Sequence, residues 1–208
     1  DAKRAEKRRA DMPDILDSDM ANAARMAKRH GEKIRHTPEQ GWLVFEGRRW
    51  AADESGVLVQ ALAKETVVAL FDEIRESGDR DTLFRHAKRS QSRTAIDSMI
   101  YLARSEPGIP ARIEQFDADS MLLNVANGTI DLRTGQLRAH CREDLISKIA
   151  DVEFDPAASF ERWDAFVWKL CGGNIELYSY LRRFVGYCLT GLTTEQVLHF
   201  LYGLGANG

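Results

Sequence analysis

The last six residues of the sequence have the spacing of a phosphate-binding loop. They read Gly-Leu-Gly-Ala-Asn-Gly and supply the G-x-x-x-x-G part of a nucleoside-triphosphate site. Glycines let successive backbone N–H groups turn toward phosphate oxygens, where a side chain would block the approach. The lysine and the hydroxyl residue that complete the motif would follow directly. The sequence therefore predicts nucleotide binding at Gly203, Gly205, Ala206, Asn207 and Gly208.

The same six residues leave two other interpretations open. They also satisfy G-x-G-x-x-G, the fingerprint of dinucleotide-binding oxidoreductases, in which an acidic residue would follow about twenty positions later. The third interpretation is a glycine-rich turn in a purely structural interaction module. The residues after Gly208 in the gene separate these interpretations, because Lys followed by Ser or Thr would indicate a triphosphate site.

Basic side chains are concentrated in one stretch with helical periodicity. Arg85, Lys88 and Arg89 share a face at i, i+3 and i+4, and Arg93 follows them. Such a face binds the phosphate backbone of DNA. The alternative is a solvated helix face that is paired with nearby aspartates. Because the net charge of the chain is −3, a DNA-binding prediction depends on this local patch.

Two acidic pairs and three cysteines are candidates for metal ligands. Asp17-Ser18-Asp19 and Asp117-Ala118-Asp119 have the D-x-D spacing of metal-holding carboxylates. We interpret both as helix caps or turns, because Asp and Ser are common there. Cys141, Cys171 and Cys188 lack a C-x-x-C pair and a partnered histidine spacing. We therefore predict no metal site and no catalytic residue in this chain.

The first half of the chain predicts helices around a small sheet. Capping residues after position 16 predict a short helix that ends at Gly31 in the left-handed conformation. The β-prone runs within 42–50 flank Glu46-Gly47 and predict a hairpin. An amphipathic pattern from Val67 to Gly78 and two further helical stretches lead to residue 105.

The second half predicts a meander, two helices and a strand. Residues 122–125, 129–132 and 136–140 alternate with turn signals and predict three strands. Helical periodicity returns over 158–191, and the run 197–202 is typical of a strand buried on both faces of a parallel sheet. The large apolar side chains of the two helices are expected to face one shared core: Trp163, Phe166, Leu170, Leu181, Phe184 and Val185.

The composition is that of a globular chain. Its 208 residues are 44% hydrophobic and 29% charged, which suits one unit of ordinary size or two small ones. No run approaches the roughly 18 apolar residues of a membrane span. The N-terminus is charged where a signal peptide needs an apolar segment. We expect a cytoplasmic protein without a membrane partner.

The stretch Leu122–Gly135 reads Leu-Leu-Asn-Val-Ala-Asn-Gly-Thr-Ile-Asp-Leu-Arg-Thr-Gly. It resembles the L-N-x-x-N-G-x-x-D-L-x-T-G stretch of phage and plasmid primases of the satellite-phage type. The resemblance covers roughly residues 17–208. The other segments that are similar to this family in order and spacing are 42–50, Phe154–Ala157, Trp163, Gly186–Gly191 and Tyr202–Gly208.

This resemblance implies a division of the chain and a role for it. Such proteins resemble the poxvirus helicase-primase, whose N-terminal region precedes a superfamily-three helicase, a hexameric AAA-type ring that moves on DNA with ATP. The chain would then be α+β throughout its N-terminal region. The implied parts are a linker or charged helix at 1–16, the α+β region at 17–157, a helical collar at 158–191, and the first strand and phosphate-binding loop of a truncated ATPase at 192–208.

The resemblance also implies cofactors and partners. ATP and Mg²⁺ would be cofactors of the parent, and DNA its partner, with self-association as a ring in a bacterial host cell or prophage. The remaining motor residues would follow Gly208, so we expect these 208 residues alone not to hydrolyse ATP or hold it tightly. DNA engagement and ring assembly are the roles expected for this part.

Overall fold

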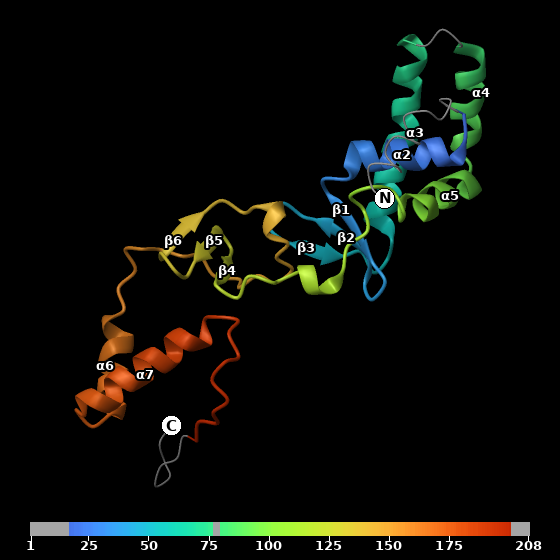
Figure 1. Cartoon of the computed structure of the whole chain (residues 1–208). Helices are drawn as coiled ribbons and strands as arrows, with labels where there is room; N and C mark the ends of the chain where they lie inside the picture. Colours follow the sequence, from blue (N-terminus) through green and yellow to red (C-terminus); the bar gives the residue numbers. More distant parts are fainter. Residues whose placement is uncertain (1–16, 77–79, 201–208) are drawn as a thin grey trace. The chain divides into compact units, whose positions relative to one another are not determined.

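The computed structural model of the chain describes residues 17–76 and 80–200, which belong to two compact units (Figure 1). The first unit runs to Ala118 and also includes Cys141–Lys148. The second unit contains Asp119–His140 and the chain from Ile149 onward. The residues that the sequence groups as 17–157 thus contribute to both units. No helix in the described ranges has the length and apolarity needed to cross a bilayer.

The described residues of the first unit form four α-helices and a three-stranded antiparallel sheet of order β1-β2-β3. Its elements are α2 (Asp19–His30), β1 (Ile34–Thr37), β2 (Gly41–Phe45), β3 (Trp50–Ala52), α3 (Val57–Glu76), α4 (Arg80–Ser90), α5 (Arg93–Ala103) and the short 3-10 helices η1 (Ile113–Gln115) and η2 (Arg142–Asp144). In Figure 1, α3 and α4 run side by side as an antiparallel pair. The predicted hairpin is confirmed as β2–β3, with Phe45 opposite Trp50.

Strand β1 was missed because Arg35 and His36 interrupt its apolar pattern. A segment further along the chain extends the sheet at this strand. The backbone N of His36 donates to Ile109 O at 2.9 Å, and Ala111 N donates to His36 O at 2.9 Å. The sheet edge beside β1 is therefore covered by residues that follow α5.

Helix α2 begins at the predicted cap, where Ser18 Oγ accepts a hydrogen bond from Ala21 N at 3.1 Å. Its predicted end is correct in position but wrong in conformation. Gly31 has a φ of −59°, so it is right-handed. A Cβ at this residue would lie 2.3 Å from Ala27 O. Glycine is needed here for a close backbone approach and not for a positive φ.

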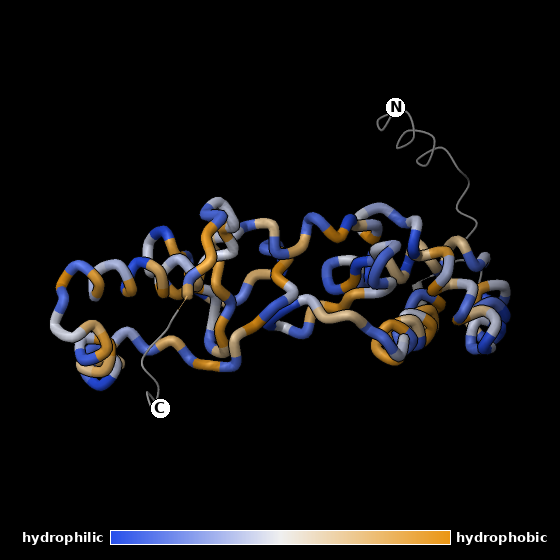
Figure 2. Tube along the Cα trace, turned by 90° about the horizontal axis from the view of Figure 1, so that it is seen from below, coloured by the Kyte–Doolittle hydropathy of each residue, from blue (hydrophilic) through white to orange (hydrophobic). Residues whose placement is uncertain are grey.

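Two groups of buried residues hold the first unit together. The larger lies between α2, α3, α5 and the sheet, and its fully buried members include Met26, Ile34 and Met99. Helix α3 begins ten residues before the predicted Val67, and Val59 belongs to this core. The smaller group consists of Leu43, Trp50 and Phe116. Figure 2 colours the described chain by hydropathy and shows hydrophobic and hydrophilic residues following one another along it.

The described residues of the second unit form a small antiparallel sheet of order β4-β5-β6 and two α-helices. Its elements are β4 (Leu122–Val125), β5 (Gly128–Asp131), β6 (Gln136–Arg138), α6 (Glu161–Leu170) and α7 (Ile175–Cys188). The predicted meander and the predicted pair of helices are both confirmed. The described residues therefore form an α+β structure.

The residues that carry the primase-like pattern build this meander. Asn127 binds the backbone of Phe154 twice, through Nδ2 to its O at 2.9 Å and through Oδ1 from its N at 3.0 Å. Asp131 Oδ1 accepts from Arg133 N at 2.9 Å in the following turn. A Cβ at Gly128 would lie 2.4 Å from Arg138 O. These residues of the pattern thus stabilise the sheet and its turns.

Gly128→Ala is expected to destabilise the second unit by about 1–3 kcal/mol, because the added methyl group must displace the backbone of β6. Gly186→Ala on α7 is the matched control. Nothing lies within 4 Å of a Cβ there, so this change should stabilise the helix by roughly 0.4–1 kcal/mol. The two variants are compared by urea denaturation. Equal stability of both would contradict the close approach at Gly128.

The predicted strand at 197–202 is not confirmed. Its described part, residues 197–200, has no regular secondary structure. Leu198 and Phe200 are 78% and 81% exposed. A strand of a parallel sheet requires neighbouring strands for its backbone hydrogen bonds. The described residues supply no strand that pairs with this segment. The segment instead contacts α7, where His199 lies 3.9 Å from Phe184 between ring centroids.

Candidate nucleic-acid interface

The predicted basic stretch is divided between two helices. Arg85, Lys88 and Arg89 lie exposed on α4. Arg93 is the first residue of α5 and forms a 3.5 Å ion pair with Asp97. The expectation of one continuous helix through all four residues is wrong, because a serine directly before Arg93 caps a new helix. The candidate interface on α4 therefore consists of three cations.

A buried polar network fixes the position of α4 against α2. Asn22 Nδ2 donates to Ser90 Oγ at 2.9 Å. His86 Nε2 lies 2.9 Å from Asn22 Oδ1 and 3.3 Å from Ser90 Oγ. All three residues are buried. Because buried polar groups without partners are costly, this network favours one register of the two helices.

The network lies beside a polar hollow of about 310 Å³, which we call the basic hollow; it is lined by Asp17, Thr82, Arg85, His86 and Arg89. Arg89 Nη2 donates to Asp17 O at 3.2 Å and lies 3.5 Å from His86 Nδ1. Arg85 Nη2 donates to Thr82 Oγ1 at 3.1 Å. A backbone carbonyl and a hydroxyl group, neither of which carries a full charge, thus orient the guanidinium groups of Arg89 and Arg85 beside the hollow.

The alternative prediction paired these cations with nearby aspartates. Arg85 Nε instead donates to the backbone carbonyl of Asp81 at 3.3 Å, and Asp79 lies outside the described residues. Within 17–76 and 80–200, no carboxylate forms an ion pair with Arg85, Lys88 or Arg89. Their positive charges are therefore not offset by ion pairs in this part of the chain.

Burial lowers the pKa of three histidines of the first unit. Desolvation is the largest cause for His30, His36 and His86. For His86, the nearby Arg25 and Arg89 lower the pKa further, while Asp17 and Asp19 oppose this effect. His86 is thus held neutral beside the basic hollow.

These shifts predict how the stability of the first unit depends on pH. The folded unit binds fewer protons than the unfolded chain once the pH falls below the ordinary histidine pKa of 6.5. The free energy of unfolding should therefore be highest above about pH 6.5 and fall below it. Urea midpoints from tryptophan fluorescence at several pH values between 5 and 8 test this. His86→Gln should make the decline shallower, and an unchanged profile in that variant would contradict the contribution of His86.

The acidic pairs are occupied by structural contacts. Ser147 donates to the Asp117 carboxylate through its backbone N and through its hydroxyl group. Asp119 forms a 2.7 Å ion pair with Arg133. Asp19 is the first residue of α2. Among the described residues no three His, Cys, Asp or Glu side chains are grouped as metal ligands would be.

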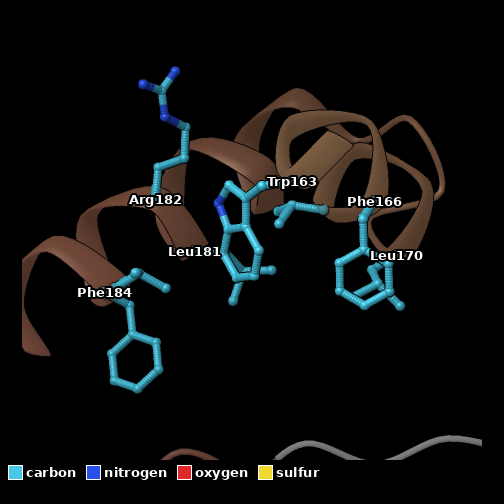
Figure 3. A pocket seen from close by; sticks show the side chains of 8 residues that line it. Trp163, Phe166, Leu170, Leu181, Arg182 and Phe184 are labelled. Atoms are coloured by element: carbon cyan, nitrogen blue, oxygen red, sulfur yellow. The ribbon is translucent and has the colours of Figure 1, made fainter. Parts of the chain in front are cut away.

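Helices α6 and α7 form an apolar groove of about 270 Å³. In Figure 3, the apolar side chains project from both helices to the same side, while Arg182 points away. Trp163, Phe166 and Leu170 are 52%, 53% and 61% exposed. The prediction of a shared core between the helices is therefore corrected to an open groove, because two helices alone leave one side uncovered. Its apolar lining is Trp163, Phe166, Val167, Leu170, Leu181, Phe184 and Val185.

The sequence matches the protein family described as D5 N terminal like over residues 23–171. The chain belongs to this family. D5 N terminal like domains are found in phage and viral primase-helicase proteins. The chain is also similar to a putative helicase of Acanthamoeba polyphaga mimivirus, with 23% identity over 188 residues. That similarity covers 80% of this chain but 20% of the relative, so the chain spans about a fifth of the relative's length.

The D5 N terminal like match extends from α2 into the end of α6. It contains α4 with His86 and Ser90, and the β4–β6 meander, whereas Asp17 and Asn22 precede it and α7 lies beyond it. The predicted nucleotide-binding residues also lie beyond it and outside the described residues: Gly203, Gly205, Ala206, Asn207 and Gly208.

Sequence reasoning missed the contribution of α2 to the basic surface. Arg25, Lys28 and Arg29 line a second hollow of about 280 Å³ between α2 and α3, together with Glu73. Arg25 is held there by a 2.9 Å ion pair with Glu73. The i, i+3, i+4 spacing of the three cations was the available signal.

Proposed function

We propose that this chain is the part of a viral or phage replication helicase-primase that engages DNA through the basic face of α4. The observation that carries this proposal is the set Arg85, Lys88 and Arg89, three exposed cations without ion pairs in the described residues. Phosphate backbones bind such faces without reading sequence. The family of the chain supports DNA as the polyanion that this face meets.

The triple variant R85A/K88A/R89A is expected to bind single-stranded DNA at least about tenfold more weakly at low salt, because three phosphate contacts are lost. Alanine favours the helix, so α4 should remain folded. Fluorescence anisotropy with a labelled oligonucleotide measures the affinity, and circular dichroism verifies the fold.

The charge-matched control is R48A/R49A/R112A, which removes three cations from other elements of the same unit. It should retain most of the affinity. If both triple variants weaken binding equally, net charge and not the α4 face accounts for the interaction, and the proposal fails.

We further propose that α6 and α7 act as a collar in the assembly of a ring. An exposed apolar groove of this kind marks an interaction surface on many proteins. Covering it with a neighbouring subunit or with the motor would bury Trp163, Phe166 and Leu170, which are largely exposed in this chain. The whole protein, and not this chain alone, would form the hexameric ring.

We also propose that Gly203–Gly208 start the ATP site of the motor, with Mg²⁺ bound by residues later in the protein. The support is the glycine spacing together with the family of the chain. Sequencing the gene beyond Gly208 tests this proposal. Lys followed by Ser or Thr agrees with it, whereas an acidic residue about twenty positions later without this pair would favour the dinucleotide-binding alternative.

A further inference from the structure

The basic hollow has features that an extended basic face does not require. A solvated cationic face needs only charges at helical spacing. Here Arg85 and Arg89 instead border an open hollow of about 310 Å³, a volume at the lower end of the roughly 300–1,000 Å³ range of small-ligand sites. The residues that line it include His86, which is buried and belongs to the Asn22–Ser90 network.

The hydrogen bonds of the network define the state of His86. Asn22 uses its Nδ2 as donor to Ser90, so its Oδ1 is the atom that faces His86 Nε2. His86 Nε2 must then carry the hydrogen. In the neutral ring, Nδ1 is left as an acceptor, and it faces Arg89 Nη2 at 3.5 Å. Burial, Arg25 and Arg89 lower the pKa of His86, which agrees with this neutral form.

Both guanidinium groups keep donors for a ligand. An arginine has five N–H donors in a planar fork. Arg89 donates to Asp17 O, and Arg85 donates to Asp81 O and Thr82 Oγ1. These acceptors carry no full charge, so they orient the forks without neutralising them. Asp17 also lines the hollow, and its negative charge raises the pKa of His86, against the effect of the nearby arginines.

We propose that the basic hollow is a discrete binding site for a phosphate group, held by the guanidinium groups of Arg85 and Arg89. Two forks that converge on one cavity suit the tetrahedral oxygens of phosphate. The phosphate could belong to a DNA backbone or to a free phosphate compound. For a DNA backbone, this inference rests on the proposed DNA engagement. For a free phosphate compound, it is independent of that proposal.

The test is an NMR titration of the 208-residue chain with inorganic phosphate at constant ionic strength. The readouts are the Nε–H resonances of Arg85 and Arg89 and the ring nitrogens of His86. We expect saturable shifts at all three residues. Arg89→Gln should weaken phosphate binding at least about tenfold, because a charged hydrogen bond is lost. Arg93→Gln, outside the hollow, should leave it unchanged.

A second titration uses a short single-stranded oligonucleotide and distinguishes the sources. Shifts at the same residues, with competition by phosphate, assign the site to DNA backbones. Phosphate binding without any response to DNA would support the phosphate site and would contradict DNA engagement by the α4 face. If phosphate causes no saturable shift, or if Arg89→Gln leaves binding intact, the inference is overturned. Arg89→Lys replaces Arg89→Gln if the latter unfolds, and it should also weaken binding because it keeps the charge without the fork.

Discussion

Trp50→Ala is expected to lower the free energy of unfolding of the first unit by about 3–5 kcal/mol. The side chain is 1% exposed and packs edge-on against Phe116, with ring centroids 6.0 Å apart. Its Nε1 donates to Arg142 O at 2.8 Å, so the segment that returns to this unit at Cys141–Lys148 depends on the same residue. The variant loses both the packing and this anchor. Urea denaturation with circular dichroism measures the effect.

The matched control makes the same substitution at an exposed tryptophan. Trp163 on α6 is 52% exposed, so Trp163→Ala removes far fewer buried contacts. Its cost should stay below about 1.5 kcal/mol. A control that costs as much as Trp50→Ala would contradict the assignment of Trp50 to the core.

Phe166→Asp in the whole protein is expected to abolish ring formation if the apolar groove is an assembly surface. Phe166 is 53% exposed, so a carboxylate is tolerated in the separate subunit. In an assembled interface the same carboxylate would be buried without a partner, which costs several kcal/mol. Sedimentation velocity would then show subunits where the unaltered protein forms a ring.

Glu176→Lys is the control for this experiment. Glu176 lies exposed on α7 and is not among the residues that line the groove. This variant should assemble normally. Rings that form equally well with Phe166→Asp would show that the groove is not an assembly surface.

Local patterns predicted those parts of the fold that depend on neighbouring residues. The Ser18 cap, the β4–β6 meander and the pair α6–α7 all have signals within a few residues of each other. The left-handed Gly31 was wrong because the constraint there is a close approach to Ala27, which the sequence does not display. Strand β1 was missed because its pairing with β2 outweighs its weak apolar pattern.

The candidate site was only partly predictable for a related reason. Helical spacing identified Arg85, Lys88 and Arg89, since these residues are neighbours on one helix. Asn22 and His86 are 64 positions apart and meet only because α2 packs beside α4. No local rule links them. The sequence therefore did not predict the basic hollow, although it identified Arg85 and Arg89 as DNA-binding candidates and Asp17 as part of an acidic pair.

The salt dependence of DNA binding tests the central claim most directly, because phosphate contacts release counterions in proportion to their number. The measurement is the slope of log affinity against log salt concentration for the unaltered chain and for R85A/K88A/R89A with the same single-stranded oligonucleotide. Each lost contact should reduce the slope by about 0.7, so a reduction of roughly 2 is expected for three. An unchanged slope, with unchanged affinity, would contradict DNA engagement by α4.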